Sequence, residues 1–89
     1  MRSSSVQTGI KKDCDSFAGE RSDIATARDK GMTREQVEKT IDSVYQNDPR
    51  GRLETYDLVI SIYNSPLSPR ELYEKAFDSC MEAANAPLP

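Results

Sequence analysis

Apolar residues recur at steps of three or four along most of this chain, which is the spacing of amphipathic helices. In the first such segment the pattern passes through Cys14, Phe17 and Ala18, and Gly31 follows as a natural helix stop. The pattern therefore predicts a first helix at about residues 11–30.

The second segment opens with Thr33 and Gln36, which have the spacing of a capping box at a helix N-terminus. Apolar residues follow at helical spacing, and the turn formers at residues 47–51 end the segment. The sequence predicts a second helix at about residues 34–46.

Residues 58–63 are rich in β-branched and aromatic side chains, so they fit either a short buried strand or part of a helix. We favour a helix at about residues 53–64. Leu53, Tyr56 and Tyr63 keep the helical spacing, and a single strand in a helical chain would have no pairing partner.

Ser68, Pro69 and Glu71 form the strongest local signal in the chain. Serine is a good helix cap, proline suits the first helical position, and the glutamate completes a second capping box. We predict a last helix at about residues 69–84.

Cys14 and Cys80 are the only cysteines, and each shares a helix face with apolar residues. We interpret them as a disulfide, which in a chain-entropy model stabilises such a fold by about 4 kcal/mol. Two reduced buried cysteines and a redox-active thiol are the alternatives. The predicted fold is all-α: a small four-helix bundle closed by a disulfide between the first and the last helix.

The domain organisation follows from these elements. Residues 10–84 form one helical domain, between a disordered tail at 1–9 and a short tail at 85–89. The predicted core draws on apolar residues of all four helices: Phe17, Ile24, Val37, Ile41, Val44, Leu53, Tyr56, Ile60, Leu72, Ala76 and Phe77.

Composition narrows the range of functions. The 89 residues include 12 Lys and Arg against 15 Asp and Glu, giving a net charge of −3, so we expect no nucleic-acid partner. No apolar run is long enough for membrane insertion. The chain has no histidine, and its cysteines lack zinc-site spacing. We therefore expect no enzyme activity, catalytic residue, metal site or cofactor.

Four acidic residues step by three, four and four along the last predicted helix. This acidic ridge is formed by Glu71, Glu74, Asp78 and Glu82. It is either a solvated helix face or a surface complementary to a basic protein.

Three further residues are candidates for partner contact. Arg50 and Arg52 flank Gly51 in a predicted exposed turn and have the chemistry to bind a carboxylate or phosphate. Tyr63 precedes a proline-rich loop, although tyrosines in such a chain are more often core residues with a hydroxyl reaching water.

Cys14, the segment Ala27-Arg28-Asp29-Lys30-Gly31, the segment Tyr63-Asn64-Ser65-Pro66 and Cys80 together resemble small exported all-helical bacterial proteins of unassigned function. The resemblance covers about residues 14–80. It implies a periplasmic or secreted helical bundle with one disulfide, and it implies no functional residue.

The function expected from the sequence is a non-catalytic protein-binding module of the bacterial envelope. One version is an inhibitor or immunity protein that binds a basic hydrolase or toxin. The alternatives are a structural or stress-related periplasmic protein that self-associates or holds clients, and a cytosolic adaptor with free thiols. We expect a monomer or weak homodimer, whose signal peptide would already have been removed.

Overall fold

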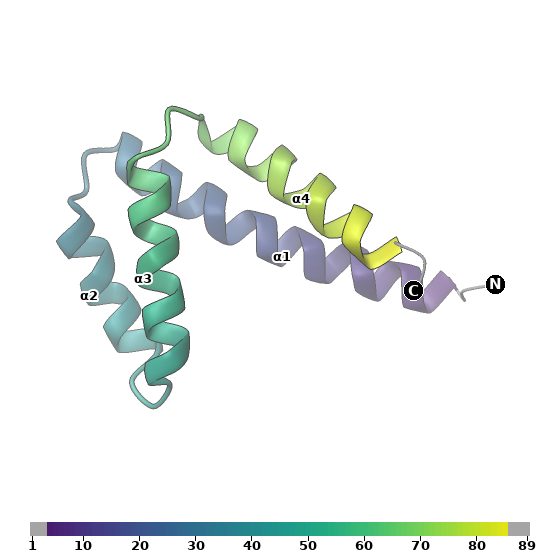
Figure 1. The fold of residues 1–89 in the computed structure, drawn as a ribbon, viewed down its shortest axis with the longest axis horizontal. Coiled ribbons are helices and arrows are strands. Elements are labelled where there is room, and N and C mark those ends of the chain that lie inside the picture. The colour runs from purple at the N-terminus through teal and green to yellow at the C-terminus, as the bar shows by residue number, and fades with distance from the viewer. Residues whose placement is uncertain (1–3, 86–89) are drawn as a thin grey trace.

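The computed structural model describes residues 4–85, with side chains from Thr8 onward. This part of the chain forms four α-helices and no strand, which confirms the predicted all-α class (Figure 1). The helices are α1 (Ser4–Asp29), α2 (Arg34–Val44), α3 (Pro49–Tyr63) and α4 (Pro69–Asn85).

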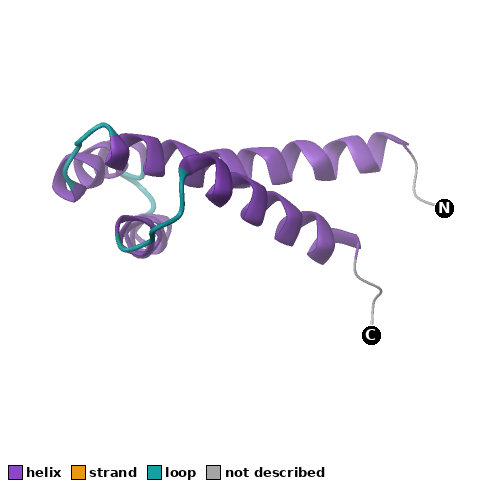
Figure 2. Cartoon of the chain, turned by 90° about the horizontal axis from the view of Figure 1, so that it is seen from above, coloured by secondary structure: helices purple, strands orange, loops and turns teal. Residues whose placement is uncertain are grey.

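The four helices pack as two antiparallel pairs. Helix α4 runs back along α1, and we call this pair the arm; α2 and α3 form a hairpin at the C-terminal end of α1 (Figure 1). Seen from above, α1 and α4 lie close together near the hairpin and diverge toward the chain termini, whereas the hairpin is viewed nearly end-on (Figure 2). The bundle is therefore bent at the place where the hairpin meets the arm.

Both predicted capping boxes are present. The backbone N–H of Gln36 donates to Thr33 Oγ1 at 3.2 Å, and Gln36 Oε1 accepts from the Thr33 N–H at 2.8 Å. At the start of α4, the Glu71 N–H donates to Ser68 Oγ at 3.1 Å, and Glu71 Oε1 accepts from the Ser68 N–H at 3.2 Å. Local sequence thus sets the start of both helices.

Helix α1 ends as predicted but begins earlier. Gly31 has a φ of 91°, and the Met32 N–H donates to the Ala27 carbonyl, a glycine-terminated helix end. The predicted start near residue 11 is wrong, because α1 begins at Ser4 and residues 4–9 of the predicted tail are helical. A helix that has already formed can be extended without an apolar face. The spacing of apolar residues therefore did not reveal that residues 4–9 are helical. Asn85, the first residue of the predicted C-terminal tail, is the last residue of α4. The other tail residues, 1–3 and 86–89, lie outside the described residues.

Residues 58–63, for which a strand was the alternative, belong to helix α3, as predicted. This helix begins at Pro49 rather than near residue 53. Asp48 is its N-cap, with a carboxylate oxygen that accepts from the Gly51 N–H at 3.0 Å. Pro49 fits the first helical position because it lacks the N–H that would be unpaired there. The turn formers at residues 47–51 are thus partly a helix start.

The main core lies where α1, α2 and α3 meet. Its buried residues are Ile24, Ala25, Val37, Ile41, Val59 and Ile62. Ile24, Val37 and Ile41 were predicted as core residues, and the structure confirms them. A second buried site, formed by Cys14 and Ala18, lies on the face of α1 that meets α4.

Four residues that were predicted to lie in the core are exposed instead, so the prediction is wrong for them. Phe17 is 41% exposed, Val44 71%, Leu53 61% and Ile60 38%. Helix α3 buries the face of Thr55, Val59 and Ile62 instead of the neighbouring one, because its run of β-branched residues supplies apolar side chains on more than one face. Val44 ends α2, beyond the part of that helix that is buried.

The predicted bond between Cys14 and Cys80 is present. It links α1 to α4 across 66 residues, with the two Cα atoms 5.5 Å apart, and no described cysteine is free. Helix α4 has no fully buried residue. The disulfide is therefore a major link between α4 and the rest of the molecule.

Candidate functional site

The acidic ridge lies on α4, and all four of its carboxylates are exposed. Cys80 and Tyr73 show which face of α4 meets α1, because Cys80 is bonded to Cys14 and the Tyr73 hydroxyl donates to Asp15. At 3.6 residues per turn, the ridge lies on roughly the opposite side of the helix. It is thus directed away from the packed face of the arm.

The two halves of the ridge differ in their contacts. Glu71 belongs to the capping box, and Glu74 pairs with Arg70 at 3.0 Å across one helical turn. None of the ion pairs found among the described residues involves Asp78 or Glu82. Acidic side chains toward the C-terminal end of a helix are disfavoured by the helix dipole. Stabilisation of α4 therefore does not explain why positions 78 and 82 carry the acidic residues Asp78 and Glu82.

The two arginines predicted in an exposed turn lie in the first turn of α3 instead. Arg50 pairs with Glu54 at 3.3 Å on the helix surface, whereas Arg52 is half-buried. They step by two along a helix, so they do not share a face. The structure does not place them as a pair of donors for one anion.

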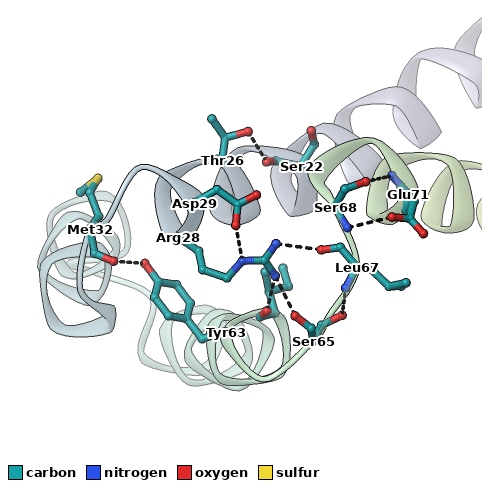
Figure 3. Close-up of polar contacts among 11 residues, drawn as sticks. Ser22, Thr26, Arg28, Asp29, Met32, Tyr63, Ser65, Leu67, Ser68 and Glu71 are labelled. Carbon is teal, nitrogen blue, oxygen red and sulfur yellow. Dashed lines mark hydrogen bonds and ion pairs between the residues drawn. The ribbon is translucent and has the colours of Figure 1, made fainter.

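Tyr63, the third candidate for partner contact, is half-buried at the end of α3. Its hydroxyl donates to the Met32 carbonyl at 2.7 Å (Figure 3), joining α3 to the loop after α1. Burial raises the pKa of the Tyr63 hydroxyl, although the nearby Arg28 opposes this shift. The hydroxyl is thus used within the fold.

Arg28 has a role that sequence reasoning missed. Its Nη1 donates to the carbonyls of Ile62 at 2.7 Å and Ser65 at 3.1 Å, and its Nη2 donates to the carbonyl of Leu67 at 2.7 Å (Figure 3). Its Nε also pairs with Asp29 at 2.9 Å. One guanidinium thereby ties the end of α1 to the end of α3 and to the loop before α4.

An open groove of about 770 Å³ lies between α1 and α2, with one residue contributed by α3. Most of the α1 residues that line it lie on the side of that helix away from Cys14. Asp15, which accepts from the Tyr73 hydroxyl of α4, lies between that side and the packed face. The lining is mostly apolar and carries three carboxylates: Asp15, Ser16, Gly19, Glu20, Asp23, Ile24, Ala27, Met32, Val37, Thr40, Ile41, Val44, Tyr45 and Thr55. No pattern in the sequence predicted it, because it exists only where two helices cross.

A comparison of the chain with protein-family models, curated proteins and solved structures found no match. Among the described residues, no helix is long and apolar enough to cross a membrane, and no group of three or more Cys, Asp and Glu residues is placed to hold a metal ion. Two surface features of the described residues carry the proposals below: the acidic ridge on α4 and the groove between α1 and α2.

Proposed function

We propose that this chain is a non-catalytic protein-binding module of the bacterial envelope, and that the acidic ridge receives a basic partner protein. The observation that supports this proposal is the row of exposed carboxylates on the outward face of α4. Helix α4 is held by the disulfide near one end and follows a loop tied to Arg28 at the other. A fixed helix presents its charges in a constant arrangement.

The energetic effect of such a ridge is expected mainly in association. Neighbouring like charges on a helix weaken it slightly, but a row of them steers a partner of opposite charge and rejects partners of like charge. A basic hydrolase or toxin has the required charge, so an inhibitor or immunity protein remains the concrete version of this proposal.

The compartment belongs to the proposal as well. Disulfides persist in oxidising compartments and are rare in the cytosol, so the bond between Cys14 and Cys80 supports a periplasmic or secreted location. The cytosolic adaptor requires free thiols, and both thiols of this chain are joined in the bridge.

Charge reversal tests the ridge. We expect the double variant Glu74→Lys with Asp78→Lys to lower capture of a basic partner from a native envelope extract by at least about tenfold, because two attractive charges become repulsive. The matched control is Glu54→Lys with Asp57→Lys, which makes the same charge change on α3. Unchanged capture by the α4 variant, or equal loss in both variants, would contradict the proposal.

A structural or client-holding protein is the second candidate, and the exposure of Val44 and Leu53 favours it. If these side chains mediate self-association, sedimentation at micromolar concentration should show a salt-insensitive dimer. The double variant Val44→Ser with Leu53→Ser should then sediment as a monomer. A wild-type protein that is already monomeric would exclude the self-associating form of this candidate.

A further inference from the structure

The groove between α1 and α2 combines a buried apolar floor with exposed apolar side chains at its mouth. Ile24, Val37 and Ile41 belong to the core and form the floor, whereas Met32 and Val44 are exposed. Exposed apolar side chains in a concave site gain more by contact with a partner than those scattered over a convex surface.

The charged residues of the groove are all acidic. Asp15, Glu20 and Asp23 line it, and no Lys or Arg does. Asp15 accepts from the Tyr73 hydroxyl, which raises the pKa of Tyr73. None of the ion pairs in the described part of the chain involves these three carboxylates. The rim is therefore complementary to positive charge.

Arg21, next to Glu20 in sequence, makes none of the ion pairs found among the described residues. Burial lowers the pKa of its guanidinium, and the Glu20 carboxylate opposes this shift. The guanidinium of Arg21 lies over the Phe17 ring at 3.6 Å from the ring centre and donates to the Phe17 carbonyl at 2.8 Å. Both residues line a smaller hollow of about 350 Å³ on another side of α1, next to α4. The hydrogen bond and the ring contact of Arg21 are thus made away from the groove, although its charge still acts on Glu20.

We propose that this groove binds a basic amphipathic helical segment of a partner protein. Its apolar stripe would cover Met32 and Val44, and its lysines or arginines would reach the acidic rim, as in other cases of a helix bound in a groove. Small residues on α1 leave room for a backbone, since a Cβ on Gly19 would meet no atom within 4 Å.

This inference does not rest on the acidic ridge. Asp23 and Gly19 lie on the side of α1 away from Cys14, whereas the ridge lies on the side of α4 away from Cys80. The two surfaces are therefore on opposite sides of the arm. Variants of one surface leave the other intact, so the two proposals fail independently.

The test uses a fluorescent synthetic helix of about five turns, made of leucine and lysine in an amphipathic pattern. A peptide with glutamate in place of lysine is the charge control. We expect fluorescence anisotropy to show binding of the lysine peptide that weakens with added salt, and much weaker binding of the glutamate peptide. No binding of the lysine peptide, or equal binding of both peptides, would overturn the inference.

Variants of the protein locate the binding site. Gly19→Leu should weaken lysine-peptide binding by about tenfold, because a Cβ at this position meets no atom within 4 Å and the rest of the side chain would occupy groove space. Gly9→Leu is the matched control: it makes the same change on the same helix, also in open space, but outside the groove, and should bind normally. Circular dichroism would check that both variants are folded.

A second variant tests the rim independently of the floor. Glu20→Lys with Asp23→Lys should also weaken the lysine peptide by about tenfold, whereas Glu74→Lys with Asp78→Lys should not. Peptide binding that survives both groove variants, or that is lost only in the α4 variant, would overturn the proposal that the groove binds a basic helix. The proposal for the acidic ridge would then be unaffected. A dimer of the protein that Gly19→Leu dissociates would identify the occupant as a second copy and also overturn it.

Discussion

Arg28 connects three parts of the chain through a single side chain that is only 15% exposed. Its acceptors are main-chain carbonyls at the end of α3 and in the loop before α4. Hydrogen bonds from a charged donor are among the stronger ones, and a buried carbonyl left without its donor is costly. The fork of the guanidinium also fits several carbonyls at once, which an ammonium group does not.

We predict that Arg28→Ala lowers the free energy of unfolding by about 2–4 kcal/mol. Arg28→Lys should recover only part of this loss. The control is Arg50→Ala, because the Arg50 side chain is 91% exposed and its ion pair should contribute less than about 1 kcal/mol. Urea unfolding monitored by circular dichroism would measure the free energy of unfolding of all three variants. Equal losses in Arg28→Ala and Arg50→Ala would show that the Arg28 hydrogen bonds contribute little to stability.

The sequence contained a hint of this role but not the contacts. Arg28 continues the apolar spacing of α1, which is an unusual position for a charged residue. Its bond to Ser65 joins the segments 27–31 and 63–66. Its partners lie 34 to 39 residues away, and helical spacing encodes only contacts within a few residues.

At the scale of elements, helix starts were predictable where a cap was recognised. Thr33 and Ser68 placed the starts of α2 and α4 correctly. Asp48 and Pro49 carry the same kind of signal, but their neighbours Asn47 and Gly51 also suit a turn, so the start of α3 was placed too late. Capping residues thus allow the start of a helix to be predicted only when the same residues do not fit a turn equally well.

Helix faces were predictable where one side is apolar and the other polar. The disulfide followed from Cys14 and Cys80 lying on such faces, and it is present. In α3, apolar residues occupy several faces, so the buried one depends on how α1 and α2 cross it. The groove depends on the same crossing. Neither the buried face of α3 nor the groove could be read from spacing alone.

At the scale of the whole molecule, the bend between arm and hairpin leaves much surface exposed. The radius of gyration is 14.8 Å, whereas a compact chain of this length has roughly 12 Å. Within the described part of the chain, only the junction of α1, α2 and α3 has a cluster of several buried side chains, since α4 buries none fully. The arm therefore depends on covalent closure more than the hairpin does.

This dependence predicts an uneven response to loss of the disulfide. The double variant Cys14→Ala with Cys80→Ala should lower the free energy of unfolding by about 4 kcal/mol. Amide hydrogen exchange should accelerate most in the C-terminal part of α4 and in the facing part of α1, because the bridge joins these two parts covalently. Protection at Val59 and Ile62 should remain, since they lie in the junction core.

Wild-type protein treated with a reductant provides the matched comparison, because it loses the bond while keeping both side chains. It should show the same gradient along α4, decreasing toward Pro69, where the Arg28 contact with Leu67 still holds the preceding loop. Equal acceleration in all four helices would mean that arm and hairpin unfold as one unit. In that case the disulfide would act only by constraining the unfolded chain, without an additional local effect on the packing of α4 against α1.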